Sequence, residues 1–372
     1  NSLAAGFDGI GIQFNVPNDT AVVIESIPGG PAQKCGVLAG DRLLMVDDVN
    51  IAGVHYPQDS MVRRMKGPAG TKVKVTVKRD GEVIPFEITR GKIPMHSVDA
   101  AFMTSATDGY VRVSKFSRST YEEFVKAIAG LRAQGMEHLV VDLRDNSGGY
   151  FDQALMMSNL FLPKDSLIVF LEGRKRARED YRADGRGPYQ DLPVSLLINE
   201  GSASSSEIFA GALQDNHRAT IVGRRSFGKG LVQEPINFTD GSGIRLTVAR
   251  FHTPSGRCIQ KPYTEDYAFE VYKRYAGSEM VQKDSMKIEN GGIIPDVFVP
   301  LDTTRASDFY IKCNKKASAL RFASHYFDKH HAELSAIDDY AQLLDYLDQA
   351  ELDKQFLQFV KKTDGLVPKK GE

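Results

Sequence analysis

The sequence predicts an α/β protein in three parts, and three patterns along the chain predict it. Residues 1–92 alternate apolar and polar side chains with a period of about two, which indicates a small β-rich domain. Residues 93–304 alternate apolar strands with amphipathic helices, which indicates an α/β core. Residues 305–372 are rich in Leu, Lys, Asp, Ala and Gln and poor in glycine, which indicates a helical extension. A length of 372 residues suits two or three domains.

Composition and charge exclude several classes of protein. The 47 Lys and Arg residues against 48 Asp and Glu leave a net charge of −1, so no overall positive field favours nucleic acid or an anionic membrane. No apolar run approaches the ~20 residues that cross a bilayer. Three scattered cysteines are too few for a disulfide framework or a CxxC metal site, so we expect neither a metal nor a cofactor. Because the chain begins without an initiator methionine, we expect that a targeting segment preceded Asn1.

The first domain should contain several short strands and one helix. Period-two alternation predicts strands at residues 22–27, 43–49, 73–77 and 83–89. Asp80-Gly81 marks a tight turn between the last two, which makes them a hairpin. Residues 58–65 are polar with Val62 and Met65 on one side, a pattern typical of a short helix.

The core should be a sheet with crossover helices. Its predicted strands are 110–113, 138–143, 167–171, 194–198 and 220–222, and its predicted helices are 119–131, 151–162 and 207–215. The sequence from Ser119 to Glu122 fits a capping box at the start of the first helix. The nearly continuous apolar run 138–143 indicates a buried parallel strand. Two further helices, 307–327 and 337–361, are predicted in the C-terminal extension.

The charged stretch 172–187 has two interpretations. Its arginines would suit a nucleic-acid patch, whereas its interspersed acids and only two tyrosines favour a solvated hairpin or lid over the sheet. We expect the hairpin or lid.

A glycine motif near the N-terminus suggests peptide binding. Gly9-Ile10-Gly11-Ile12 precedes a strand, and its outward backbone N–H groups would make a nest for an anion. Together with Pro28-Gly29-Gly30-Pro31-Ala32 and Gly40-Asp41-Arg42-Leu43, it resembles a PDZ domain. The resemblance implies that this loop holds the terminal carboxylate of a peptide that adds as a strand. The alternative is a β-rich spacer without a ligand.

A serine-rich turn is the first candidate for covalent chemistry. Residues 199–207, with serines at 202, 204, 205 and 206, follow a buried strand and open a helix. The free N–H groups and partial positive charge of a helix N-terminus would stabilise an oxyanion. The alternative is purely structural, because Ser204 and Glu207 also fit a capping box.

A lysine between two glycines is the candidate base. Lys229 stands between Gly228 and Gly230 after a predicted strand. A lysine folded into such a tight turn is predicted to be desolvated, which would lower its pKa and make it a neutral base. The alternative is a surface turn lysine. None of the eight histidines lies in a motif of a Ser-His-Asp hydrolase, and no Gly-x-Ser-x-Gly elbow occurs.

Five motifs together resemble the carboxy-terminal processing, or tail-specific, serine protease family. They are Asp142-Leu143-Arg144-Asp145-Asn146-Ser147-Gly148-Gly149, the run 201–207, Ser226-Phe227-Gly228-Lys229-Gly230 with Gln233, the segment 246–256, and Gly292-Ile293-Ile294-Pro295-Asp296. With the PDZ segment they run in the family's order from about residue 7 to 300. The resemblance implies a PDZ domain at 1–92 and a protease core with a crotonase/Clp-like sheet at 93–304. Composition adds the helical extension at 305–372.

The resemblance also implies roles for single residues. Ser204 would be the nucleophile, Lys229 its base and Gln233 the residue that orients the lysine. The oxyanion hole would use the backbone N–H of Ser205 and of a glycine in the pair Gly148 and Gly149.

Three other positions carry expectations from the same resemblance. Lys66 stands where relatives often carry an arginine that links peptide binding in the PDZ domain to the active site. Asp215 matches an acid whose role is structural rather than chemical. The sequence departs from the family pattern at Ser205, usually Ala, and at Asp145, often Gly.

The implied function is a serine endopeptidase that cleaves proteins near their C-terminus without a metal or cofactor. The expected partners are substrates with apolar C-termini, and further copies of the chain in a homo-oligomer. The family works outside the cytoplasm, in the periplasm or at an envelope membrane. Two alternatives stay open: a catalytically silent PDZ-containing peptide-binding scaffold, and a crotonase-like acyl-CoA enzyme. The latter lacks an evident adenine or phosphate site.

Overall fold

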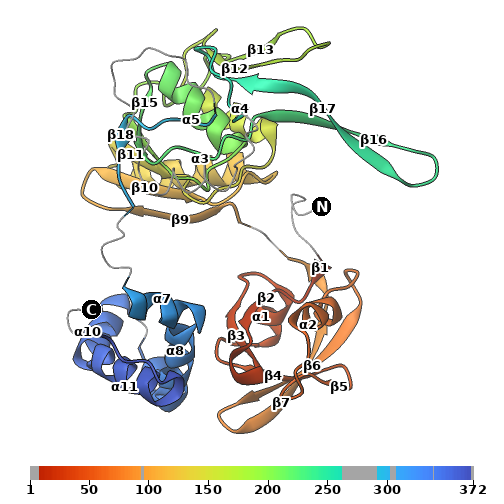
Figure 1. Cartoon of the computed structure of the whole chain (residues 1–372), viewed down its shortest axis with the longest axis vertical. Helices are drawn as coiled ribbons and strands as arrows, with labels where there is room; N and C mark the ends of the chain where they lie inside the picture. Colours follow the sequence, from red (N-terminus) through yellow and green to blue (C-terminus); the bar gives the residue numbers. More distant parts are fainter. Residues whose placement is uncertain (1–7, 94–95, 262–290, 302–306, 338, 370–372) are drawn as a thin grey trace. The chain divides into compact units, whose positions relative to one another are not determined.

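The computed structural model describes residues 8–93, 96–261, 291–301, 307–337 and 339–369 (Figure 1). The chain divides into two compact units, one built on Met95–Leu301 and the other on Gly6–Pro94 with Asp302–Glu372. In the described part of the chain, every helix is too short or too polar to span a bilayer. The same residues contain no cluster of His, Cys, Asp and Glu side chains that could hold a metal ion.

The N-terminal part is a small β-rich fold, as the alternation predicts. Its main sheet has the order β2-β3-β4-β6-β7. These strands are β2 (Ile12–Asn15), β3 (Ala21–Ser26), β4 (Arg42–Val46), β6 (Lys72–Arg79) and β7 (Glu82–Thr89). The short strands are β1 (Asp8–Gly9), which pairs with β8 (Gly91–Lys92), and β5 (Val49–Asn50), which pairs with β4. The helical elements are η1 (Pro17–Asp19), α1 (Pro31–Cys35) and α2 (Gln58–Met65).

The predicted hairpin and helix of this part are confirmed. β6 and β7 pair antiparallel from Lys72 with Thr89 to Arg79 with Glu82. Val73, Val75 and Val77 are buried because alternate residues of a strand point to one face.

The core contains a mostly parallel sheet, as its apolar strands predict. The order is β18-β15-β14-β11-β10-β9, and only β9 runs antiparallel to its neighbour. The strands are β9 (Val98–Met103), β10 (Asp108–Val113), β11 (His138–Asp142), β14 (Val194–Ile198), β15 (Ala219–Gly223) and β18 (Val297–Phe298). The crossover helices are α3 (Thr120–Ala133), α4 (Phe151–Asn159) and α5 (Ser205–Asp215). A single apolar core joins them, with Phe124, Phe161 and Phe209 fully buried at its centre.

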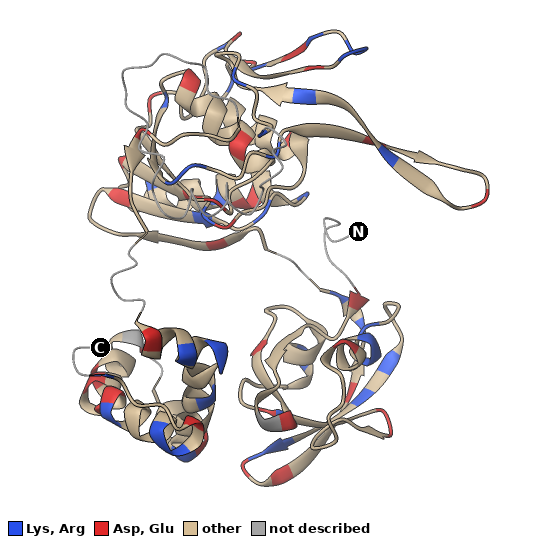
Figure 2. Ribbon diagram, in the orientation of Figure 1, with Lys and Arg blue, Asp and Glu red and all other residues tan. Residues whose placement is uncertain are grey.

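A second sheet, with the order β13-β12-β17-β16, extends from the core. Its strands are β12 (Leu167–Glu172), β13 (Glu179–Arg182), β16 (Leu231–Asn237) and β17 (Gly243–His252). The β16–β17 hairpin projects beyond the remainder of the core (Figure 1). The charged stretch forms the β12–β13 hairpin, which carries both basic and acidic positions (Figure 2). On it, Arg178 and Arg182 both pair with Asp180. The interpretation as a solvated hairpin is therefore confirmed.

The C-terminal extension is helical, but the two long helices predicted there are wrong. The structure has α7 (Asp308–Lys315), α8 (Ser318–Lys329), α9 (His331–Ser335), α10 (Tyr340–Gln349) and α11 (Leu352–Asp364). Ala317 and Glu351 adopt left-handed backbone angles, with φ of 49° and 48°, and each ends the run of one helix before the next begins. Phe322 of α8 packs against Phe356 and Phe359 of α11.

Candidate active site

Ser204 occupies a strained turn between a buried strand and a helix. β14 ends at Ile198, and α5 begins at Ser205, so Ser204 is the N-cap residue of α5. Its φ of 56° and ψ of −113° lie in a region that a residue with a side chain rarely adopts. Such a turn exposes the side chain beside the free N–H groups of the helix, which is the geometry of a nucleophilic serine. The capping box with Glu207 is also formed, so the structural and the chemical interpretations of this motif do not exclude each other.

The four serines of this run differ in what their hydroxyl groups do. Ser202 donates to Leu143 O at 2.8 Å, Ser206 donates to Asn146 O at 2.9 Å, and both side chains are fully buried. Ser205 is also buried and donates to Gly149 O at 3.0 Å. Ser204 is only half-buried, and its hydroxyl donates to no residue in the described part of the chain. Its hydroxyl group is therefore the one of the four that is available to a substrate.

Glu207 joins the serine turn to the lysine turn. Its Oε1 accepts from the Ser226 hydroxyl at 2.5 Å and from the Gly228 N–H at 2.6 Å. Its Oε2 accepts from the N–H groups of Ser204 and Lys229, both at 2.8 Å. The carboxylate is fully buried, and four donors fill the acceptor positions of its two oxygens. Burial raises the pKa of Glu207, although these hydrogen bonds oppose the rise.

The desolvated lysine predicted from the sequence is not found. The Lys229 side chain is exposed, whereas its neighbours Gly228 and Gly230 are buried. The Gly228 carbonyl accepts from Lys261 N at 3.0 Å, and the Gly230 N–H donates to Gln260 Oε1 at 3.0 Å. These contacts fix the inner side of the turn, so the residue between the two glycines directs its side chain outward. The structure does bring the Lys229 backbone to Ser204 through Glu207, but it gives no hydrogen bond from the Lys229 side chain among the described residues.

Gln233 lies farther along β16, and its side chain is exposed. Its amide nitrogen lies 3.4 Å from the Thr247 hydroxyl of β17, to which it donates. The structure therefore places Gln233 on the hairpin, and its role in orienting Lys229 stays a prediction.

The glycine loop after β11, residues 145–150, lies against the serine turn and is called the oxyanion loop below. A Cβ atom added to Gly148 would lie 2.7 Å from Ser204 Cβ and 2.9 Å from Ser205 N, so only glycine permits this approach. A Cβ atom on Gly149 would lie 2.0 Å from Phe116 O. The two glycines are thus required by close packing on both sides of the loop.

The hydrogen bonds of this loop select one of its two glycines as a candidate donor. The Gly148 N–H donates to Asn146 Oδ1 at 2.9 Å, and Asn146 is itself fixed by a 2.7 Å bond to Val113 O. In the described part of the chain, the Gly149 N–H makes no hydrogen bond, and neither does the N–H of Ser205 at the start of α5. Of the donors predicted for the oxyanion hole, the N–H groups of Ser205 and Gly149 are therefore the remaining candidates.

The two departures from the family pattern have local explanations. The Ser205 hydroxyl bonds the Gly149 carbonyl, so it ties α5 to the oxyanion loop. Asp145 has a φ of 62°, which explains why glycine suits this position, and its carboxylate accepts from Asn199 Nδ2 at 2.9 Å. Asp145 is therefore held by a partner rather than pointing a free charge at the loop.

Asp215 lies at the far end of α5 from Ser204 and pairs with Arg257. Its other carboxylate oxygen accepts from Ser255 N at 2.9 Å. With a helical rise of about 1.5 Å per residue, α5 separates Asp215 from Ser204 by roughly 16 Å. This separation supports the structural role expected for Asp215.

The predicted peptide-binding loop has free donors. Ile10 and Gly11 lie between β1 and β2, with Gly9 ending β1 and Ile12 beginning β2. The carbonyls of Ile10 and Gly11 accept from Ala32 and Ile27, but their N–H groups make no hydrogen bond within the described residues. Lys66 is the C-cap residue that follows α2, and its side chain is exposed.

Family models identify both parts of this arrangement. Residues 108–269 match the model of peptidase family S41, and residues 9–89 match that of the PDZ domain. The core belongs to peptidase family S41. The fold class predicted from the sequence, a PDZ domain with an α/β protease core and a helical extension, is therefore confirmed.

Relatives of the S41 core include carboxyl-terminal-processing proteases. The chain is 37% identical over 260 residues to the one from Synechocystis sp., which covers 68% of this chain and 60% of the relative. It is 39% identical over 268 residues to the one from Bartonella bacilliformis, which covers 70% of this chain and 60% of the relative. The solved structure of a photosystem II D1 C-terminal processing protease is 29% identical with a TM-score of 0.46, over 80% of this chain and 74% of that chain. The chain thus spans about 60% of the length of these two sequence relatives.

Sequence reasoning missed two residues of the S41 site. The sequence pattern assigns Glu207 only to a capping box, although its carboxylate also binds the lysine turn. The sequence pattern gives Asn146 no role of its own, although its Oδ1 accepts a hydrogen bond from the Gly148 N–H. Only the three-residue spacing from Ser204 could have indicated Glu207, because its other partners lie on a distant turn.

Proposed function

We propose that this chain is a serine endopeptidase that cleaves protein substrates near their C-terminus, with Ser204 as nucleophile and Lys229 as general base. The observation that carries the proposal is the strained Ser204 turn, whose hydroxyl donates to no described residue and which packs against the oxyanion loop at Gly148. Within the described residues, the N–H groups of Ser205 and Gly149 make no hydrogen bond. Glu207 supports it, because one carboxylate oxygen holds the backbones of both Ser204 and Lys229.

The chemistry follows from these positions. Ser204 Oγ attacks the scissile carbonyl carbon while a neutral Lys229 amine takes the hydroxyl proton. The carbonyl oxygen becomes an oxyanion, which accepts from the N–H groups of Ser205 and Gly149. Collapse expels the leaving amine, which takes the proton from Lys229, and water then hydrolyses the acyl-enzyme by the same steps. Because Lys229 is exposed without substrate, we propose that a bound peptide covers it and orders it, with Gln233 as its orienting partner.

The PDZ domain would select the substrate. The unbonded N–H groups of Ile10 and Gly11 would hold a C-terminal carboxylate, and the peptide would add to β2, which is an edge strand. We propose that the preferred substrates have apolar C-termini. Lys66, which follows α2, would couple substrate binding in the PDZ domain to the active site of the core. We also propose an extracytoplasmic location, as the resemblance implies, which cell fractionation would test.

Incubation with an unfolded, casein-like protein tests the proposal. Wild-type chain should degrade it, whereas Ser204→Ala should be inactive and retain its far-UV circular dichroism. Ser206→Ala is the matched control, since its buried hydroxyl donates to Asn146 O and should affect stability but not abolish turnover. Lys229→Ala and Lys229→Arg should both be inactive, because a guanidinium does not deprotonate at workable pH. Full activity of Ser204→Ala would refute the nucleophile.

One observation favours a second candidate function. The exposed side chain of Lys229 is also compatible with a PDZ-containing peptide-binding scaffold without catalysis. That function predicts tight binding of apolar C-terminal peptides by the wild-type chain and no hydrolysis of any of them.

A further inference from the structure

The core begins with a short segment, residues 96–98, which is called the entry segment here. Residues 94 and 95, which join it to the PDZ domain in the sequence, lie outside the described residues. Glu123 of α3 holds this segment: its Oε2 accepts from Ser97 N at 2.7 Å and from Val98 N at 3.0 Å. His96 adds its Nδ1 4.0 Å from the same oxygen. The entry segment is therefore fixed to α3 by one carboxylate.

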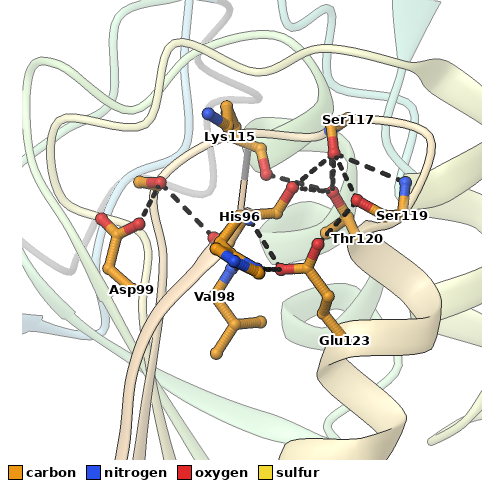
Figure 3. A network of polar contacts seen from close by, with 10 residues as sticks. His96, Val98, Asp99, Lys115, Ser117, Ser119, Thr120 and Glu123 are labelled. Atoms are coloured by element: carbon orange, nitrogen blue, oxygen red, sulfur yellow. Dashed lines mark hydrogen bonds and ion pairs between the residues drawn. The ribbon is translucent and has the colours of Figure 1, made fainter. Parts of the chain in front are cut away.

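Three buried hydroxyl groups form a hydrogen-bonded network between the entry segment and the start of α3. Ser97 Oγ lies 2.5 Å from Ser117 Oγ, and Thr120 Oγ1 donates to Ser97 Oγ at 2.7 Å. Figure 3 shows Ser117, Ser119, Thr120 and Glu123 gathered in this network. Thr120 Oγ1 also accepts from Ser117 N at 2.7 Å, and Ser119 donates to Glu123 Oε1 at 2.6 Å. Ser97 and Thr120 are fully buried and Ser117 nearly so. The predicted capping box at Ser119 is therefore wrong: Ser119 donates to Glu123, and Thr120 provides the acceptor for the turn.

The other side of this turn contacts the oxyanion loop. Phe116 donates to Gly148 O at 3.0 Å and accepts from Tyr150 N at 2.7 Å. Beyond it, the Arg118 guanidinium lies 4.7 Å from the centre of the Tyr150 ring. Tyr121 N donates to the nearly buried Gln153, just after the loop, at 2.9 Å. The turn 116–121 thus holds the backbone on both sides of Gly149.

Burial of hydroxyl groups needs a physical reason, because an apolar cluster of the same size would be stable without exact hydrogen-bond geometry. Every hydroxyl of this network has a partner, and such a network is satisfied in only one arrangement of the segments that carry it. We propose that Ser97, Ser117, Thr120 and Glu123 are positioning residues that set the oxyanion loop according to where the chain enters the core from the PDZ domain. The regulatory part of this inference rests on the proposed peptidase function, whereas the positioning part does not.

Backbone hydrogen exchange tests the positioning without any need for catalysis, and the Ser204→Ala chain is used for it. Glu123→Ala should raise exchange about 10-fold at the amides of Ser97 and Val98 and also at the Tyr150 amide, which donates to Phe116 O. A change of about 10-fold is the effect of losing a charge-assisted hydrogen bond. Glu122→Ala is the matched control, because Glu122 lies on the same turn of α3 but is exposed. Glu123→Gln retains an acceptor and should restore most of the protection.

Two further measurements complete the test. Ser97→Ala removes a single hydroxyl group, so the same exchange measurement on this variant tests the proposal if Glu123→Ala fails to fold. The amides of β14 are the control for a global loss of structure. In the otherwise wild-type enzyme, Glu123→Ala should lower kcat on a short internal peptide about 10-fold with KM unchanged, since the oxyanion hole acts in the transition state. Increased exchange at Ser97 and Val98 without any increase at the Tyr150 amide would overturn the proposal. Absence of all hydrolysis, with the exchange result as expected, would refute the peptidase function and leave the positioning network intact.

Discussion

At the scale of single residues, Glu207 links the two turns of the candidate site. One buried carboxylate binds the backbones of the serine turn and the lysine turn, so the two candidate catalytic residues share a single support. A side chain with four donors around it is held in one rotamer, which is what a catalytic geometry requires.

Glu207 should also give the proposed peptidase an acid limb in its pH profile. Protonation removes acceptor capacity while four donors still point at the carboxyl group, so the ionised form is the active one. Burial raises the pKa of Glu207 above the ordinary range of a glutamate, so kcat should fall with decreasing pH at values above that range. Stability should change in the opposite direction, being greatest below the ordinary glutamate pKa and declining as pH rises through the raised value.

The Glu207→Gln variant tests this prediction. Its amide group cannot accept all four bonds, so we expect kcat about 100-fold lower and no acid limb from this group. Measurement of kcat against pH for both proteins decides the matter. A wild-type profile in Glu207→Gln would show that the link between the two turns is dispensable.

Asp142 shows the opposite electrostatic balance at the end of β11. Burial by itself disfavours its carboxylate, but the Arg144 guanidinium, at 2.6 Å, and the Tyr110 hydroxyl, also at 2.6 Å, outweigh it and lower the pKa of Asp142. A carboxyl group with a lowered native pKa contributes stability above its unfolded pKa, and this contribution disappears as pH falls through the native value.

The expected consequence is an acid-sensitive contribution to stability below about pH 4, the ordinary aspartate range. Asp142→Asn should cost about 1–3 kcal/mol at neutral pH, because the buried side chain loses charge-assisted hydrogen bonds from Arg144 and Tyr110. Its stability should then depend less on pH between about 4 and 2 than that of the wild type. Urea unfolding across this range measures both effects, and equal slopes in the two proteins would contradict the assignment.

At the scale of secondary-structure elements, the C-terminal extension shows how a single backbone conformation divides a helix. Ala317 has a φ of 49° between α7 and α8, a conformation that costs an L-residue about 1–2 kcal/mol and that glycine adopts freely. Amphipathic periodicity continues across this position, so the pattern predicted one helix where the chain forms two.

Ala317→Gly should therefore stabilise the protein by about 0.5–1 kcal/mol, after the greater freedom of glycine in the unfolded chain is taken into account. Ala323→Gly is the matched control, since Ala323 lies inside α8 and the same substitution there should destabilise by about 1 kcal/mol. Thermal unfolding of the two variants should give shifts of opposite sign. A destabilised Ala317→Gly would mean that its left-handed conformation is absent in solution.

At the scale of the whole molecule, the chain combines a PDZ domain with a core of peptidase family S41. If the PDZ domain reads a C-terminal carboxylate, deletion of residues 7–92 should change the rate on tailed proteins far more than on short internal peptides. The unbonded N–H groups of Ile10 and Gly11 are the expected donors to that carboxylate.

Amidation of the substrate tail is the sharper form of this prediction, because it leaves the enzyme intact. An amide cannot accept as strongly as a carboxylate, so cleavage of the amidated substrate should resemble that by the deletion variant. Competition by a free-acid peptide, but not by its amide, provides the control. Equal cleavage of amidated and free-acid tails would refute the carboxylate-reading role.

The sequence by itself determined the order of domains, the parallel strand at β11 and the two turns that carry Ser204 and Lys229. These features follow from periodicity and from short motifs, which depend on neighbouring residues. Tertiary structure alone decided which serine hydroxyl is available, since the bonds that occupy Ser202, Ser205 and Ser206 reach a different loop. The tertiary structure also decided that the Lys229 side chain is exposed and that the Glu207 carboxylate joins two turns. It decided as well that the Asn146 side chain accepts from the Gly148 N–H. These outcomes depend on contacts between segments far apart in the chain, which no local pattern specifies.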